Sequence, residues 1–296
     1  MLDAIIVGAG PAGLTAAIYL ARFKRRFHVV HDDRSRAGWI TLSHNHPGFP
    51  EGVSGPDLLE RTRRQAERYG AKIVSGVVDE LRATDGAFTL SIDGADHAAR
   101  TVLLATGVVD RAPPLPGVED AIREGLVRIC PICDGFEVAG APVAVIGDDA
   151  LGAREALFLQ TYSDQVSLIH TGASEALDAG ERDRLASANI RIVELQIEQI
   201  TLDNDRNVAV CFTEAGPRPF RAVYSALGAR ARCELAVQAG ASVGDDGRLI
   251  VDDHQQTTVP GLFAAGDLVR GLNQISTAQG EAAIAATAIH NRLREG

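Results

Sequence analysis

The sequence is poor in aromatic residues, which make up 5% of the chain, and it has no apolar run long enough to span a membrane. Its first ten residues lack the basic region and cleavage site of a signal peptide. We therefore expect a cytoplasmic protein that does not enter membranes. Lys and Arg number 29 against 39 Asp and Glu, for a formal net charge of −10. Because nucleic-acid binding needs a basic face that neutralises phosphates, this balance argues against it.

Cysteine is also scarce, with four residues in a chain of 296, which is too few for a disulfide-stapled scaffold. Cys130 and Cys133 form a close pair. Cys211 and Cys233 stand alone beside apolar or helical-looking sequence, as small buried hydrophobes do. A zinc site needs four ligands and usually two close pairs, so the spacing disfavours zinc and we expect no metal.

Glycine, in contrast, is abundant, with 30 residues. A strand, a glycine-rich turn, a helix and a second strand are predicted at residues 4–7, 8–13, 14–23 and 27–31. In the turn, Gly8 permits the tight bend, Gly10 lets the backbone approach a pyrophosphate, and Gly13 lets the helix pack against the strand. Asp32 follows the second strand, where an acid can hydrogen-bond a ribose hydroxyl. The pattern predicts a dinucleotide-binding βαβ unit.

A second βαβ pattern is predicted at residues 142–146, 147–152, 153–161 and 165–170. We therefore expect an α/β fold with two Rossmann-like nucleotide-binding domains, the second inserted into a discontinuous first domain. The first, an FAD-binding domain, should comprise residues 1–112 and 241–296, and the inserted domain residues 113–240.

The most informative stretch is Cys130-Pro131-Ile132-Cys133-Asp134. Two intervening residues bring the sulfurs within disulfide range. Such a pair can have a lowered thiol pKa, which makes one sulfur a nucleophile that exchanges through a mixed disulfide. Asp134 is adjacent and can shuttle a proton. The stretch predicts a redox-active disulfide.

Cys-Pro-Ile-Cys-Asp-Gly-Phe ahead of a second Rossmann strand resembles the low-molecular-weight thioredoxin reductases, and the resemblance covers nearly the whole chain. It implies an FAD-dependent disulfide oxidoreductase that forms a homodimer. In this role Cys133 would be the sulfur nearest the flavin, Cys130 the one that attacks a partner disulfide, and Asp134 the acid or base. The positions that the resemblance and the first glycine motif assign to the cofactor are Gly8, Gly10, Pro11, Ala12, Gly13, Asp32, Asn45, Ala105, Thr106, Gly107, Gly266, Asp267, Gln274 and Ile275.

The sequence departs from the family at the second nucleotide motif. Asp149 replaces the glycine that lets the backbone approach a pyrophosphate, and Asp148 adds a second negative charge. The two arginines that clamp the 2′-phosphate of NADPH in the family are Thr171 and Gly172 here. Both changes predict that NADPH is not an efficient electron donor.

Several functions fit these features. The first passes electrons from flavin through the disulfide to thioredoxin or a similar small dithiol, with ferredoxin or an unidentified donor as the electron source. The second is an oxygen-dependent dithiol oxidase, and the third a conventional NADPH-linked thioredoxin reductase. The fourth is a flavin-bearing module whose middle domain holds another nucleotide or a second flavin.

Overall fold

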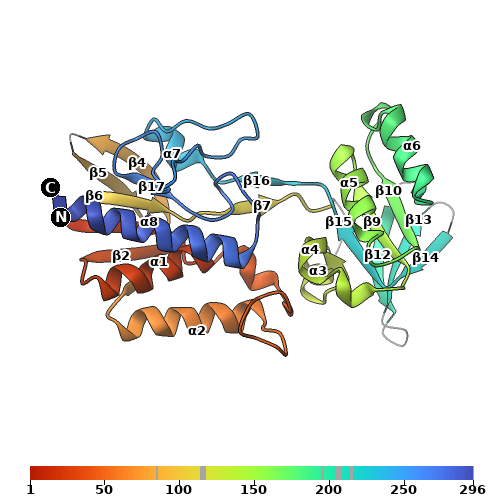
Figure 1. Cartoon of the computed structure of the whole chain (residues 1–296), viewed down its shortest axis with the longest axis horizontal. Helices are drawn as coiled ribbons and strands as arrows, with labels where there is room; N and C mark the ends of the chain where they lie inside the picture. Colours follow the sequence, from red (N-terminus) through yellow and green to blue (C-terminus); the bar gives the residue numbers. More distant parts are fainter. Residues whose placement is uncertain (85, 114–117, 195–196, 204–207, 214–215, 296) are drawn as a thin grey trace. The chain divides into compact units, whose positions relative to one another are not determined.

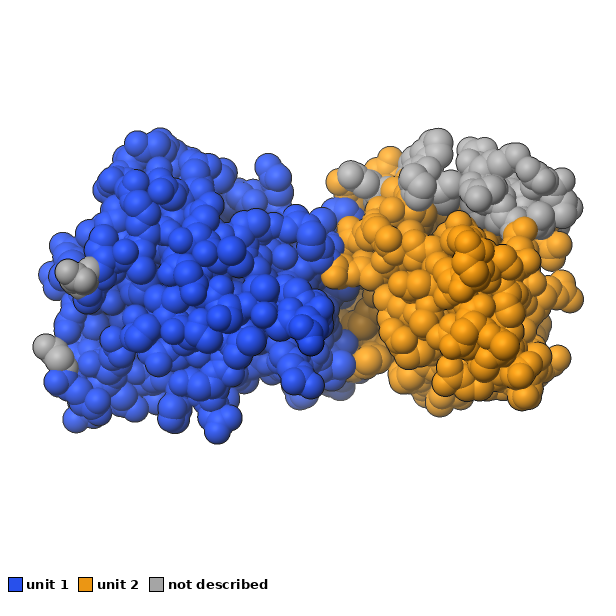
Figure 2. Space-filling model, turned by 90° about the horizontal axis from the view of Figure 1, so that it is seen from above, with its two compact units in different colours: residues 1–40, 46–109, 230–296 blue, residues 41–45, 110–229 orange. Residues whose placement is uncertain are grey.

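The computed structural model describes residues 1–84, 86–113, 118–194, 197–203, 208–213 and 216–295. The chain divides into two compact units, coloured in Figure 2: residues 1–40, 46–109 and 230–296, and residues 41–45 and 110–229. The chain leaves the first unit along β7 (Val108–Asp110) and returns along β16 (Ala229–Ala231), and these two strands pair with each other. The domain limits expected from sequence, residues 112 and 241, remain predictions.

A seven-stranded sheet of order β3-β2-β1-β6-β5-β4, with β17 beside β6, forms the centre of the first unit (Figure 1). Its strands are β1 (Leu2–Val7), β2 (Phe27–His31), β3 (Lys72–Ser75), β4 (Val78–Thr84), β5 (Ala87–Ile92), β6 (Ala95–Leu104) and β17 (Leu262–Ala264). Strands β1, β2, β3, β6 and β17 run parallel, whereas β4 and β5 pair antiparallel. Residues Ala4–Val7 of β1 are all buried, as in a parallel strand covered on both faces.

Two helices with small side chains cover one face of this sheet. Helices α1 (Pro11–Arg22) and α8 (Ile275–Glu295) share one core cluster, and many of the residues that they bury there are alanines. Helix α2 (Gly55–Arg68) packs on α1 and is capped by the Ser54 side chain, which accepts from the backbone N–H of Asp57. The opposite face is covered in part by α7 (Glu234–Gln238). The α1–α8 layer places both helix N-termini near the carboxyl ends of the parallel strands.

The second unit contains a five-stranded parallel sheet of order β11-β10-β9-β15-β8. Its strands are β8 (Val127–Arg128), β9 (Val143–Gly147), β10 (Val166–His170), β11 (Arg191–Val193) and β15 (Ala222–Ser225). The helical segments are α3 (Val118–Arg123), α4 (Pro131–Asp134), η2 (Phe136–Val138), α5 (Ala150–Leu159), η3 (Ser174–Ala176) and α6 (Ala179–Ser187). A three-stranded antiparallel sheet is formed by β12 (Ile197–Asp203), β13 (Val208–Thr213) and β14 (Gly216–Phe220).

The expected α/β fold with two Rossmann-like halves is confirmed, with a local difference. The helix predicted to begin at residue 153 begins at Ala150, inside the expected turn, since Asp149 caps it. The side chain of Cys211 lies outside what the structure describes, whereas Cys233 is buried, as expected. None of the helices in the described ranges is long and apolar enough to cross a membrane.

Candidate functional site

The turn between β1 and α1 has the shape of a phosphate cradle. A Cβ atom on Gly8, whose φ is +109°, would lie 2.3 Å from the Ala105 carbonyl oxygen, and one on Gly13 would lie 1.9 Å from the Gly8 oxygen. Both positions therefore exclude a side chain. Gly10 is the N-cap of α1 and makes no side-chain cap, and Pro11 occupies the first turn. The first N–H groups of the helix thus face outward with the positive end of its dipole, which suits a diphosphate.

Two further segments meet the glycine turn. Ala105, which follows β6, touches Gly8, and a Cβ atom on Gly266, which follows β17, would lie 3.2 Å from Cβ of Ala12. The N–H of Gly266 donates to Oε2 of Glu281 on α8 at 2.7 Å. Burial raises the pKa of Glu281, and the nearby charge of Asp267 raises it further. The carboxyl ends of three parallel strands therefore converge, as expected of a dinucleotide site.

Carboxylates flank this cradle. Asp32 comes directly after β2 and pairs with Arg34 at 3.7 Å and Arg232 at 3.8 Å. Asp267 pairs with Arg36 at 3.4 Å. Carboxylate oxygens at these places can accept hydrogen bonds from ribose and ribityl hydroxyls.

The remaining predicted cofactor residues are placed as follows. Thr106 donates from Oγ1 to the Arg232 carbonyl at 2.7 Å, and Gly107 has a φ of +67°. Gln274 immediately precedes α8, and Ile275 is its first residue. Together with the glycine cradle, these residues fit FAD: N–H donors for the diphosphate and acceptors for the hydroxyls, in one unit.

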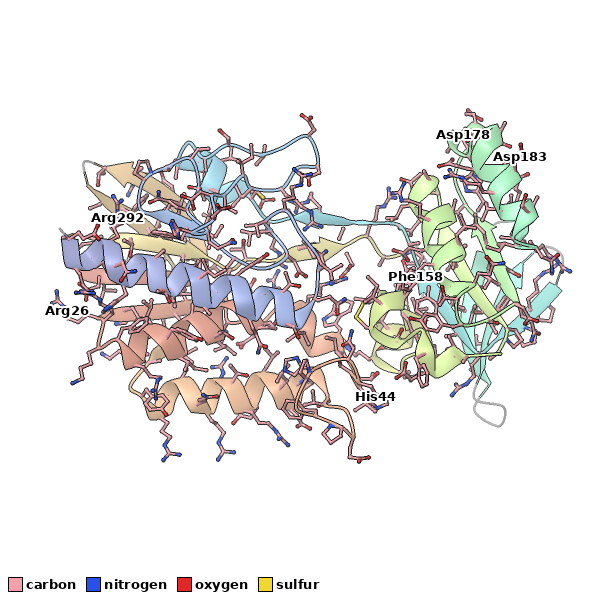
Figure 3. The ribbon with its side chains drawn as sticks, viewed as in Figure 1. Arg26, His44, Phe158, Asp178, Asp183 and Arg292 are labelled. Atoms are coloured by element: carbon pink, nitrogen blue, oxygen red, sulfur yellow. A yellow bond between two sulfur atoms is a disulfide. The ribbon has the colours of Figure 1, made fainter. Side chains whose placement is uncertain are left out.

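Asn45 is the exception among the predicted cofactor residues. The segment Thr41–Asn45 groups with the second unit, where Nδ2 of Asn45 donates to the Ile132 carbonyl at 3.3 Å. Its neighbour His44, labelled in Figure 3, contacts Glu137 through Nδ1 and Oε1 at 2.6 Å. A flavin contact of Asn45 stays a prediction. The segment does reach the helix that carries the cysteines.

Cys130 and Cys133 form a disulfide with an S–S distance of 2.04 Å and a Cα–Cα distance of 5.3 Å. Cys130 is the N-cap of the short helix α4, and the N–H of Cys133 donates to the Cys130 carbonyl at 3.0 Å. Pro131, at the first helical position, supplies a fixed φ where no N–H is needed. The sequence therefore sets the sulfur pair in the first turn of a helix, within the expected disulfide geometry.

Asp134 ends α4 and is held from two strands of the sheet. The Tyr224 hydroxyl on β15 donates to its Oδ1 at 2.9 Å, and Arg128 on β8 pairs with its Oδ2 at 3.5 Å. Burial raises the pKa of Asp134, whereas Arg128 and the Tyr224 hydrogen bond act in the opposite direction. A carboxyl group in this environment can change protonation closer to neutral pH than an exposed aspartate.

The second glycine motif keeps its packing role, and an aspartate that caps the following helix stands between its two glycines. Cβ atoms added to Gly147 or Gly152 would lie 2.5 and 2.8 Å from the other glycine's Cα, so both positions keep α5 close to β9. Between them, the Asp149 side chain accepts from the N–H of Leu151 at 2.8 Å. The N-terminus of α5 is thus capped by a carboxylate of its own chain.

Of the two positions that hold the 2′-phosphate arginines in the family, Thr171 carries no charge and Gly172 has no room for a side chain. A Cβ atom on Gly172 would lie 2.1 Å from the backbone oxygen of Asp148. The nearby cation Arg111 pairs with Asp148 at 2.7 Å and also donates from Nε to the Leu227 carbonyl at 2.7 Å. Its charge is therefore already compensated within the unit.

Sequence reasoning missed the polar neighbours of the predicted groups. Tyr224 and Arg128 hold Asp134, Glu137 pairs with His44, and Glu281 accepts from Gly266. Arg128, two residues before Cys130, carried a usable signal, since a basic residue there can reach the acid after Cys133. Tyr224 carried none, because it lies in an apolar strand far along the chain.

Comparison with known proteins agrees with this geometry. The family model described as pyridine nucleotide-disulphide oxidoreductase matches residues 2–282. The thioredoxin reductase of Mycolicibacterium smegmatis is 33% identical over 277 residues, covering 90% of this chain and 88% of its own length. That of Streptomyces coelicolor is 32% identical over 284 residues, covering 90% and 86%. The crystal structure of thioredoxin reductase from Streptococcus pyogenes superposes with a TM-score of 0.91 at 26% identity, covering 100% of this chain and 99% of that one. The chain therefore belongs to the pyridine nucleotide-disulphide oxidoreductase family, as an FAD-dependent disulfide oxidoreductase of the thioredoxin reductase type.

Proposed function

We propose that this enzyme passes electrons between flavin and the Cys130–Cys133 disulfide, and on to thioredoxin or a similar dithiol, without using NADPH as its efficient donor. The observation that carries the proposal is the capping of α5 by Asp149, whose side chain accepts from the N–H of Leu151. A dinucleotide pyrophosphate needs those N–H groups and the positive end of the helix dipole.

The negative charge of Asp149, like its position as the helix cap, disfavours a pyrophosphate. A pyrophosphate at the N-terminus of α5 would meet the Asp149 carboxylate and its neighbour Asp148. Like charges in contact repel, by about 1 kcal/mol in bulk water and more where solvent is excluded. The only glycine of the motif to be replaced is the one that the pyrophosphate needs, because Gly147 and Gly152 keep the strand–helix packing.

The arginines that select NADPH by its 2′-phosphate are also missing from the second unit. Gly172 packs against the Asp148 backbone, and an arginine there would have to displace the chain. Thr171 donates its N–H to the Gly147 carbonyl at 2.9 Å and offers no cation. Since arginine's planar fork is what recognises a phosphate, neither position supports a preference for NADPH over NADH.

The cysteine pair and Asp134 supply the thiol chemistry. FAD, when bound, supplies a two-electron carrier that exchanges electrons with a dithiol. On the partner side, Cys130 would attack a disulfide through its thiolate, and Cys133 would resolve the mixed disulfide. Asp134, next to Cys133, would accept and return the protons.

The test is anaerobic mixing of the FAD-loaded protein with excess NADPH, and separately NADH, while the flavin absorbance is followed. We expect no bleaching by either nucleotide and full bleaching by dithionite and by a dithiol. Fast bleaching at micromolar NADPH would contradict the proposal and leave a conventional thioredoxin reductase.

The remaining partners also stay proposals. Ferredoxin is the proposed electron donor, and oxygen is the proposed acceptor if electrons flow from the dithiol to the flavin. A homodimer and a cytoplasmic location are expected from the resemblance and from the sequence.

A further inference from the structure

We propose that Tyr224 and Arg128 are positioning residues for the proton chemistry of the cysteine pair, because they fix the Asp134 carboxylate and set the pH range in which it moves protons. The inference rests on the proposed function, in which Asp134 is the acid or base. Nothing in the resemblance assigns a role to either residue.

The geometry of the cluster is that of a built site. The Tyr224 side chain is fully buried, and its hydroxyl donates to Oδ1 of Asp134 at 2.9 Å. Arg128, with 15% of its side chain exposed, pairs with Oδ2 at 3.5 Å and donates to the Asp134 carbonyl at 3.0 Å. Each carboxylate oxygen therefore has its own partner, and the two partners come from different strands of one sheet.

Two strands rather than one loop thus fix Asp134. β8 and β15 are neighbours in the sheet, with Val127 opposite Val223 and Arg128 opposite Tyr224. The Arg128 guanidinium also lies 6.0 Å from the centre of the Tyr224 ring. Because strands hold side chains more firmly than loops do, this register restricts the carboxylate to one orientation.

The charged groups around Asp134 act in both directions. Burial raises its pKa most, and the charge of Glu137 raises it further, while Arg128 and the Tyr224 hydroxyl lower it by favouring the carboxylate. Glu137 is itself in contact with His44. Removing the Tyr224 hydroxyl or the Arg128 charge should therefore raise the pKa of Asp134 further, so that the base form appears only at higher pH.

The proton steps follow from the balance of the exchange. The Cys130 thiolate attacks one sulfur of the partner disulfide; a Cys130–partner bond forms, the partner's own S–S bond breaks, and the departing sulfur takes a proton. Cys133 then loses its proton, and its thiolate attacks Cys130, forming the enzyme disulfide and releasing the second partner thiol. Two electrons and two protons pass from enzyme to partner. Asp134 would take the proton of Cys133 in the second step.

The experiment separates these two steps. The FAD-loaded enzyme is reduced with a dithiol, freed of it anaerobically, and mixed with dithiodipyridine, which releases one thiopyridone when Cys130 attacks and another when Cys133 resolves the mixed disulfide. Both rates are measured against pH. We expect Tyr224→Phe to move the inflection of the second phase upward by about one pH unit and to leave the first phase in place. Arg128→Gln should move the inflection in the same direction. Arg128→Lys keeps the positive charge, so its inflection should lie close to that of the wild type.

The controls distinguish positioning from a general structural effect. Tyr162→Phe removes a hydroxyl from a ring that lies against Gly135, and it should leave both phases unchanged. Asp134→Asn should abolish the inflection. If Tyr224→Phe and Arg128→Gln both keep the wild-type profile while Asp134→Asn changes it, the inference is overturned. If Asp134→Asn changes nothing, the acid–base role falls and the inference with it, whereas the flavin-bleaching test still decides the use of NADPH.

Discussion

Replacing Asp149 tests the argument about the second nucleotide motif most directly. Asp149 caps α5 by accepting from the N–H of Leu151 at 2.8 Å. Asp149→Gly removes both the charge and the cap and restores the glycine that a pyrophosphate needs. Asp149→Asn removes the charge alone, because asparagine caps a helix as well as aspartate does. The two variants therefore separate repulsion from occupancy of the helix N-terminus.

The expected size of the effect follows from the contact distance. Two unit charges 4 Å apart repel by about 4 kcal/mol at an effective dielectric constant of about 20 and by about 1 kcal/mol in bulk water. Asp149 is exposed, so the lower end applies, and about 1.4 kcal/mol corresponds to tenfold in affinity. Freeing the Leu151 N–H adds to this for glycine alone. Folding should tolerate the change, since glycine at an N-cap costs only about a few tenths of a kcal/mol.

The assay is calorimetric titration with NADH and with NADPH, supported by anaerobic flavin bleaching. We expect affinity to increase in the order wild type, Asp149→Asn, Asp149→Gly, by about tenfold or more overall. NADH and NADPH should gain equally, because Gly172 leaves no cation for a 2′-phosphate. Asp148→Asn removes the neighbouring charge and leaves the Asp149 cap in place; because it also frees Arg111 from its pair, its gain should favour NADPH over NADH, unlike the gains of the Asp149 variants. Micromolar NADPH binding by the wild type, or no gain in either Asp149 variant, would refute the reasoning.

Three further predictions concern stability and cofactor retention. Gly13→Ala would place a Cβ atom 1.9 Å from the Gly8 oxygen, so we expect purified protein without FAD absorbance, whereas Gly280→Ala, in open space on α8, should retain it. Asp178→Ala removes the capping box of α6 and should lower the free energy of unfolding, measured in urea, by about 1 kcal/mol. The control Asp183→Ala, on the same helix (Figure 3), should change it by less than about 0.5 kcal/mol. Burial raises the pKa of Glu281 in the folded protein, so its contribution to stability is present at low pH and lost as pH rises from the ordinary glutamate pKa through the raised one. Glu281→Gln should reduce the accompanying fall in melting temperature, and an unchanged fall would contradict this assignment.

The sequence predicted those parts of the site that are local in the chain. The Gly8–Gly13 turn and Asp32 belong to one strand–helix–strand unit, so their spacing alone indicates a phosphate cradle. The disulfide likewise depends on two cysteines within one helical turn. Glycine and cysteine carry these signals because few other residues satisfy the same backbone or redox requirement.

Groups brought together by sheet pairing could not be predicted in this way. Tyr224 is 90 residues from Asp134, and only the pairing of β15 with β8 brings its hydroxyl to the carboxylate. In the sequence it lies in an apolar strand and looks like an ordinary core residue. The start of α5 was misplaced for a different, local reason: Asp149 was interpreted as a lost glycine and not as the N-cap that begins the helix.

The Rossmann sheet of the second unit has a structural role besides any nucleotide binding. Gly147 and Gly152 still hold α5 against β9, and β9 pairs with β15. β15 in turn positions Tyr224, whose hydroxyl reaches the acid beside Cys133. Close packing of the strand and helix therefore supports the redox pair as well as any nucleotide site. Loss of the phosphate glycine leaves this chain of contacts intact, whereas a larger residue at Gly147 would force apart the strand on which the Asp134 cluster depends.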